Sequence, residues 1–285
     1  MMQLSALCYW LSAITKQIPR FFIILLLLIN IIGCNAINFT KEKKLSIFVP
    51  SSIFAAFCEI LDTYKKEYPD VKVSFDTEDS AALMRKIRDK NARPDIFIAN
   101  GPREIMPLLE KKLILAETIV PIGNDSVILV TLASNPKNIM RVEDLAKPEV
   151  KSISIPEPKI NSSGMVAVAL LQNLGIWDKI KDKVVFTEFG RDTRSYLIEN
   201  KTDAAIIYRS GLYEELKAYD QVIVPANMLV VEDLIKNPEG KIQFGAGILT
   251  SSKNKKLAED FIKYMTLENA KAILKKWEGI DIGTK

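Results

Sequence analysis

The feature that most constrains the fold is a regular alternation of short apolar runs with amphipathic segments, which begins at residue 44. In chain order, the first series predicts a strand Leu45–Val49, a helix capped by Ser51/Ser52 and reaching Glu67, a strand Val71–Phe75, a helix Ser80–Lys90, a strand Asp95–Ile98 and a helix Arg103–Lys112. Strands separated by helices of 10–15 residues are typical of βαβ units, so a parallel sheet covered by helices on both faces is expected.

A second series follows after a pause at Ile122-Gly123-Asn124-Asp125. It predicts a long apolar strand Ser126–Leu132, a strand Ser152–Ile155, a helix Ser163–Leu174, a strand Val184–Thr187, a helix Arg191–Glu199, a strand Ala204–Tyr208, a strand Phe244–Thr250 and the helices Lys255–Thr266 and Glu268–Lys276. The two long strands, near 124–132 and 243–250, bracket this series. We therefore expect an α/β chain with two lobes joined by two crossovers: residues 45–123 plus 245–285 form lobe 1, and residues 124–244 form lobe 2.

Small residues stand at three predicted junctions between a strand and a helix. These are Ser51-Ser52, Ser80 after Glu78-Asp79, and Asn161-Ser162-Ser163-Gly164. A helix N-terminus offers unpaired N–H donors and about half a positive charge, so several of them facing one interlobe cleft could hold a dianion. We expect neutral dipoles and hydroxyls, not cationic side chains, to neutralise it. Taken singly, each serine is better explained as an ordinary helix cap worth about 1 kcal/mol than as a ligand contact.

The composition argues against other classes of function. The chain contains no histidine, which removes the commonest general base and transition-metal ligand, and its three cysteines form no C-x-x-C pair. With 39 basic and 35 acidic residues spread without blocks, it lacks the basic face of a nucleic-acid-binding protein. There is no G-x-S-x-G elbow or phosphate loop, although a two-carboxylate hydrolase stays open. No cofactor and no direct metal ligand are expected.

The N-terminus is predicted to be a targeting segment. Lys16 and Arg20 precede an apolar run, Phe21–Ile32, which is too short to span a bilayer and fits the core of a signal peptide. The run ends in Ile31-Ile32-Gly33-Cys34, which resembles a bacterial lipobox. Residues 1–33 would then be removed, Cys34 lipidated, and residues 34–44 left as a tether outside the cytoplasm. The alternative is an uncleaved signal anchor.

Segments distributed from Lys44 to Gly279 resemble the molybdate/tungstate-binding proteins of ABC importers. They are Leu45-Ser46-Ile47-Phe48-Val49 with Ser51-Ser52, Ser80-Ala81-Ala82-Leu83-Met84-Arg85-Lys86-Ile87, Arg93-Pro94-Asp95-Ile96-Phe97-Ile98-Ala99, Leu171-Gln172-Asn173-Leu174-Gly175-Ile176-Trp177, and Tyr208 at the end of a strand. The resemblance implies a two-lobed periplasmic-binding-protein fold (type II-like), a membrane permease as partner and a monomer.

Carried over position by position, the resemblance implies five ligand contacts. Ser52 and Ser80 would each offer a hydroxyl and an N–H, Ser163 and Gly190 a backbone N–H, and Tyr208 a phenolic O–H. The ligand would be molybdate or tungstate. Alternatives are the same fold binding sulfate, phosphate, a phosphonate or a small organic anion, an enzyme, or a membrane-tethered adhesion module.

The chain departs from the family pattern beside Ser80, where Glu78 and Asp79 replace small neutral residues. A desolvated carboxylate within about 5 Å of a dianion is repelled by several kcal/mol. We therefore expect both side chains to point to solvent. If one instead faces the cleft, it could ligate the metal of the anion or indicate a different, cationic ligand.

Overall fold

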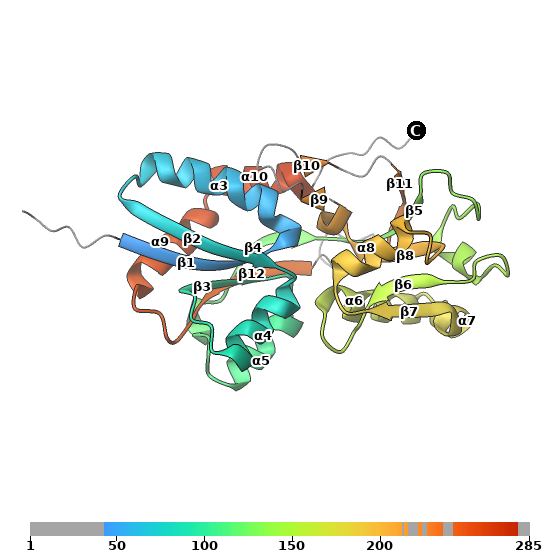
Figure 1. Cartoon of the computed structure of the whole chain (residues 1–285), viewed down its shortest axis with the longest axis horizontal. Coiled ribbons are helices and arrows are strands. Elements are labelled where there is room, and N and C mark those ends of the chain that lie inside the picture. The colour runs from blue at the N-terminus through green and yellow to red at the C-terminus, as the bar shows by residue number, and fades with distance from the viewer. Residues whose placement is uncertain (1–42, 213, 216–221, 224–226, 236–241, 279–285) are drawn as a thin grey trace, which may run out of the picture. The chain divides into compact units, whose positions relative to one another are not determined.

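The structure is a computed structural model that describes residues 43–212, 214–215, 222–223, 227–235 and 242–278. The predicted signal segment, Cys34 and most of the tether lie outside these residues. The described residues form two five-stranded mixed sheets flanked by helices, as the alternating pattern predicts, and Figure 1 shows the two sheets with their helices. The two-lobed α/β prediction is confirmed.

The first sheet has the strand order β2-β1-β3-β12-β4. Its strands are β1 (Lys43–Pro50), β2 (Val71–Glu78), β3 (Ile96–Ala99), β4 (Val120–Asp125) and β12 (Ile242–Ile248). Strands β2, β1 and β3 are parallel, whereas β12 runs antiparallel to both β3 and β4. This sheet is covered by α3 (Phe54–Glu67), α4 (Ser80–Lys90), α5 (Pro102–Glu110), α9 (Lys255–Met265) and α10 (Glu268–Glu278).

The second sheet has the order β11-β5-β8-β6-β7. Its strands are β5 (Val127–Leu132), β6 (Ile153–Pro156), β7 (Val184–Thr187), β8 (Ala204–Tyr208) and β11 (Met228–Asp233). Strands β7, β6 and β8 are parallel, and β5 is antiparallel to its neighbours β8 and β11. The helices here are α6 (Ser162–Asn173), α7 (Trp177–Ile180) and α8 (Gly190–Ile198). A two-stranded ribbon pairs β9 (Glu214–Glu215) with β10 (Val222–Ile223).

Each sheet carries its own apolar core because its buried strands are apolar on both faces. Ile47, Phe57 and Phe261 belong to a large cluster on one face of the first sheet, while Leu83 and Phe97 belong to a cluster on the other face. Two further clusters cover the faces of the second sheet, with Leu129 in one and Leu197 in the other. Separate cores let each lobe keep its shape if the connection between them bends.

Two local predictions were wrong. Residues 122–125, read as a pause because of Gly123 and Asn124, form the end of strand β4, which hydrogen-bonds to β12. Ser51 and Ser52 do not cap a helix: they lie in a 3₁₀ turn, Ser51–Ile53, and neither that turn nor α3 has a side-chain cap.

The chain passes between the sheets at two places, after Asp125 and after Asp233. Polar contacts tie the two passages together. Asp125 accepts hydrogen bonds from the N–H and hydroxyl of Ser210, and Asp233 accepts from the Ser126 hydroxyl and from Arg209. The Ser126 hydroxyl thus joins the two passages directly, and the turn after β8, through Arg209 and Ser210, contacts both.

Candidate functional site

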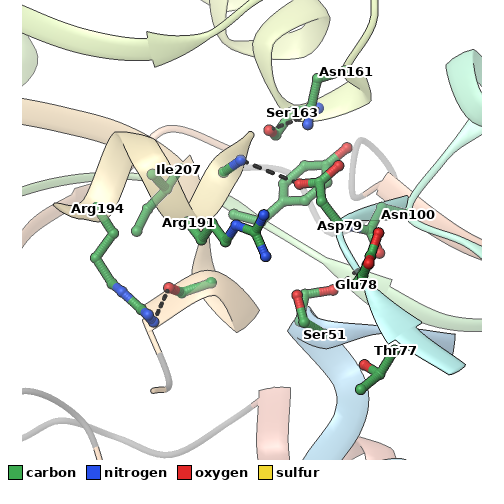
Figure 2. A pocket seen from close by; sticks show the side chains of 14 residues that line it. Ser51, Thr77, Glu78, Asp79, Asn100, Asn161, Ser163, Arg191, Arg194 and Ile207 are labelled. Atoms are coloured by element: carbon green, nitrogen blue, oxygen red, sulfur yellow. Dashed lines mark hydrogen bonds between the residues drawn. The ribbon is translucent and has the colours of Figure 1, made fainter. Parts of the chain in front are cut away.

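A pocket lies where both sheets present the carboxyl ends of their parallel strands. The 3₁₀ turn follows β1, α4 follows β2, α6 follows β6 and α8 follows β7, so helix starts from both sheets approach one space. The pocket is lined by Ser51, Ser52, Thr77, Glu78, Asp79, Asn100, Asn161, Ser163, Gly190, Arg191, Arg194, Ile207, Tyr208 and Gly211 (Figure 2). Its volume of about 240 Å³ is below the range usual for drug-sized ligands, and it is lined mainly by polar groups.

Four of the five predicted ligand residues line this pocket: Ser52, Ser163, Gly190 and Tyr208. The fifth, Ser80, is only 1% exposed and is not part of the lining. Its hydroxyl accepts a hydrogen bond of 3.2 Å from the N–H of Asn100, which does line the pocket. The Asn100 side chain in turn accepts a 3.0 Å hydrogen bond from the Ser52 hydroxyl. The two serines therefore meet through Asn100, and their contacts with a ligand remain a prediction.

The helix starts are capped by side chains other than the expected serines. Asp79 caps α4 by accepting from the Ala81 N–H, and Asn161 caps α6 by accepting from the Ser163 N–H. The Ser163 hydroxyl donates to the same Asn161 oxygen at 2.7 Å. Asp and Asn are as good at this position as serine, and they leave the following serine inside the first turn of the helix.

Tyr208 ends strand β8, and it is buried and forms part of the pocket lining. It is 4% exposed, and among the described residues its hydroxyl oxygen has no hydrogen-bond partner. Burial, followed by the charges of Glu104 and Asp125, raises the pKa of Tyr208, although the nearby Ser162 side chain acts in the opposite direction, so the hydroxyl keeps its proton and remains a donor. A buried donor without a partner costs about 1–3 kcal/mol, which a ligand oxygen would recover.

Asp79 does not point to solvent, contrary to expectation. It is 8% exposed, lines the pocket, and accepts a 3.2 Å hydrogen bond from the N–H of Gly190, which begins α8 on the other sheet. Figure 2 shows this bond as a dashed line. The expectation failed because the partner lies 111 residues away in the chain. Glu78 is partly exposed and forms a 2.9 Å ion pair with Lys86, although it also contributes to the lining.

A second carboxylate joins the two sheets beside the pocket. Glu104 on α5 is fully buried and accepts hydrogen bonds from the N–H of Ser162, at 2.9 Å, and from its hydroxyl, at the start of α6. Burial raises the pKa of Glu104 to about 7, although the bonds from Ser162 act in the opposite direction. No periodicity or motif in the sequence points to this residue.

Two arginines in the lining contradict the expectation of a pocket without cationic side chains. Arg191 and Arg194 lie three residues apart in the first turns of α8, a spacing that puts both on one face of the helix. Arg194 donates to the Gly211 carbonyl at 3.1 Å, and the guanidinium of Arg191 lies 5.1 Å from the centre of the Phe189 ring. The spacing Gly190-Arg191-Asp192-Thr193-Arg194 was the available signal.

Within the described ranges, no group of three or more His, Cys, Asp or Glu side chains could hold a metal ion. Among those same residues, no helix combines the length and apolarity needed to cross a membrane. The site is thus an arrangement of hydrogen-bond donors, two guanidinium groups and one buried carboxylate around a small polar space.

Comparison with known proteins adds an independent finding. Residues 45–277 match the family described as bacterial extracellular solute-binding protein. The chain is 22% identical over 266 residues to YvgL of Bacillus subtilis (strain 168), whose assignment as an ABC transporter substrate-binding lipoprotein is itself provisional; the match covers 92% of this chain and 97% of YvgL. It is 25% identical over 243 residues to the molybdate-binding protein ModA of Haemophilus influenzae, covering 83% of this chain and 90% of ModA.

A solved structure also shares the fold. The sulfate-binding protein SubI of Mycobacterium tuberculosis H37Rv superposes with a TM-score of 0.65 at 15% identity, over 84% of this chain and 88% of SubI. At this identity the likeness concerns the fold alone. The relatives bind different anions on one architecture, so the choice of ligand depends on the residues of the pocket.

Proposed function

Because this chain belongs to the bacterial extracellular solute-binding proteins, we propose that it captures a tetrahedral oxyanion, molybdate or tungstate, in the pocket between its lobes and delivers it to an ABC transporter permease. The observation that carries the proposal is Tyr208, which lines the pocket together with Ser52, Ser163 and Gly190, and whose buried hydroxyl, beside Ser162, has no partner with hydrogen-bond geometry among the described residues. Donors that converge from two lobes suit an acceptor-only ligand such as an oxyanion.

The two arginines strengthen the case for an anion. Guanidinium groups keep their charge at every relevant pH and donate in a planar fork that fits oxyanions. Arg191 and Arg194 therefore supply positive charge on the same side of the pocket as the start of α8. The proposed activity is binding and release, with no chemical step.

A second candidate is a different oxyanion on the same fold, such as sulfate, phosphate or a phosphonate. The specific observation in favour of phosphate or a phosphonate is Asp79, because a carboxylate inside the pocket is a hydrogen-bond acceptor for an anion that carries a proton, whereas a fully deprotonated anion such as molybdate or sulfate cannot use it.

Calorimetric titration of the full-length chain in detergent with molybdate, tungstate, sulfate and phosphate tests the proposal. We expect molybdate and tungstate to bind at least about tenfold more tightly than sulfate and phosphate, a difference of about 1.4 kcal/mol. Tighter binding of sulfate or phosphate would favour the second candidate. Heat signals at the level of buffer dilution for every anion would end the proposal.

We further propose that the protein acts outside the cytoplasm, anchored through a lipid on Cys34. This rests on the lipobox-like Ile31-Ile32-Gly33-Cys34. The substitution Cys34→Ser should move the protein from the membrane fraction to the soluble fraction. Retention of the variant in membranes would instead favour an uncleaved signal anchor.

A further inference from the structure

Asp79 places a buried carboxylate where the proposed anion would bind. One oxygen accepts from the Ala81 N–H at 2.9 Å, and the other accepts from the Gly190 N–H at 3.2 Å. These two donors belong to helix starts of different sheets, α4 and α8. The carboxylate therefore already occupies a donor, Gly190 N–H, that the resemblance assigned to the ligand.

An anion oxygen that reaches the Gly190 N–H must approach the second oxygen of Asp79 closely, because both accept from the same hydrogen. Two ionised oxygens in a buried pocket repel each other strongly. A proton between them removes the repulsion and replaces it with an O–H···O⁻ hydrogen bond, which is short and strong. The geometry thus favours a complex in which one proton lies between Asp79 and the anion. Neither the ionised carboxylate nor a fully deprotonated anion carries this proton before binding.

The groups around Asp79 determine whether its carboxyl group is more stable protonated or ionised. Burial raises the pKa of Asp79, while the N–H groups of Ala81 and Gly190 and the charges of Arg191 and Arg85 act against this rise. The negative charge of ionised Asp79 is repelled by Glu104 on α5, and it also raises the pKa of Tyr208 on β8. Glu78 precedes Asp79 on β2 but is paired with Lys86. An arriving dianion adds further negative charge, which favours protonation.

We propose that Asp79 and the bound oxyanion share a single proton. This deepens the proposed function and rests on it. With a fully deprotonated anion, such as molybdate, the proton comes from solvent, and the only bond formed is an O–H bond on Asp79. With an oxyanion that carries its own proton, such as hydrogen phosphate, the ligand supplies the proton and Asp79 accepts it. Asp79 then acts as a specificity-determining residue, because it distinguishes an anion that carries a proton from one that must take up a proton on binding.

The two sources of the proton give different pH profiles. Binding of molybdate should take up about one proton per molecule, so its Kd should rise about tenfold for each pH unit above neutrality. Binding of phosphate near pH 8, where it is largely the singly protonated dianion, should release or take up almost no proton. Calorimetry of the full-length chain in two buffers of different ionisation enthalpy measures these numbers directly, without any variant.

Two substitutions test whether Asp79 or Glu104 takes up the proton when molybdate binds. Asp79→Asn keeps a good helix cap and cannot titrate, so molybdate binding should lose its pH dependence. Glu104→Gln removes a second buried carboxylate near the pocket, and the tenfold slope should remain. Molybdate binding with no proton uptake, or an unchanged slope in Asp79→Asn, would overturn the inference while leaving the proposed function intact. If no oxyanion binds the wild-type chain, the proposed function fails, and this inference fails with it.

Discussion

The two sides of the pocket differ in chemistry, although both are built from parallel strands that run into helices. The first sheet contributes acceptors in Asp79 and Glu104, whereas the second contributes the donors at the starts of α6 and α8. Carboxylates of one lobe therefore bind helix starts of the other, and an ion pair of 2.7 Å between Arg85 and Glu188 has the opposite polarity. The comparison shows that the donors expected to bind a ligand can also join the lobes to each other.

This division of roles has a consequence for the anion. A ligand that bound the Gly190 N–H, as proposed above, would compete with Asp79 for it, so binding and the contact between lobes would be coupled through one group. Glu104 is not part of the pocket lining, and its bonds to Ser162 can persist beside a bound ligand. The two carboxylates thus allow the ligand contact and the lobe contact to be tested separately.

The largest effect is expected from Glu104→Gln, which removes the buried charge that joins α5 to α6. The pKa of Glu104 is raised from 4.5 to about 7, so the folded protein holds the proton more tightly than the unfolded chain. Its contribution to stability is complete below pH 4.5 and is lost as the pH rises through about 7. A tenfold change in proton affinity is worth about 1.4 kcal/mol, so the rise in the pKa of Glu104 corresponds to about 3 kcal/mol of unfolding free energy.

Urea denaturation of wild type and Glu104→Gln between pH 5 and 8 measures this difference. Between pH 5 and pH 8, the free energy of unfolding of wild type should fall by about 2.5 kcal/mol relative to that of the variant, because a small part of the total change lies below pH 5. Glu110→Gln is the matched control, because Glu110 lies exposed on the same helix and its loss should change the difference by less than about 0.5 kcal/mol. Parallel pH curves for wild type and Glu104→Gln would show that burial of this carboxyl carries no cost.

The next largest effects are expected from Ser80→Ala and Ser52→Ala, which distinguish the roles of these two serines of the first lobe. Both substitutions to alanine should weaken anion binding by about 1.5–3 kcal/mol if the hydroxyls bind the ligand. Only Ser80→Ala should also lower the free energy of unfolding, by about 1–3 kcal/mol, because it leaves the buried N–H of Asn100 without its acceptor. Titration with molybdate and urea denaturation of both variants give the two numbers. Normal binding by Ser80→Ala would limit Ser80 to supporting Asn100.

Much of the fold was predictable because its signals are local. Helix α4 over Ser80–Lys90 and strand β7 over Val184–Thr187 were predicted with their observed bounds, since apolar periodicity and the flanking residues determine them. Strand β4 was missed because Gly123 and Asn124 are typical of turns, and only the partner strand β12 makes the segment extended. Tertiary pairing overrode the local preference.

The site was predictable only in part, for the same reason. Residues at a strand end or in the first turn after one, such as Tyr208, Ser52 and Ser163, line the pocket because their position follows from the topology. The orientation of Asp79 depends on a hydrogen bond to Gly190 in the other lobe, which no local pattern encodes. The spacing of Arg191 and Arg194 after a predicted helix start indicates that both could line the pocket. They were not predicted as lining residues because a pocket without cationic side chains was expected.

On the second sheet, Tyr208→Phe should affect binding without affecting stability. The hydroxyl has no partner among the described residues, so its removal leaves no internal group unpaired and should leave the free energy of unfolding unchanged or slightly higher. Molybdate binding should weaken by about 1.5–2 kcal/mol. Tyr196→Phe, in α8 and away from the lining, is the control and should bind normally. A loss of stability in Tyr208→Phe would reveal an internal role for the hydroxyl.

The smallest effects are expected at Gly190, where two substitutions isolate a single N–H. A Cβ here would meet Asp79 at 3.9 Å, an ordinary contact, so Gly190→Ala should change binding by less than about 0.5 kcal/mol. Gly190→Pro removes the N–H at the first position of α8, where proline is well tolerated, and the preceding Phe189 is already extended. Titration of both variants with molybdate should show Gly190→Pro weaker by about 1 kcal/mol. Equal affinities would mean that this N–H serves the contact with Asp79 and makes no net contribution to holding the anion.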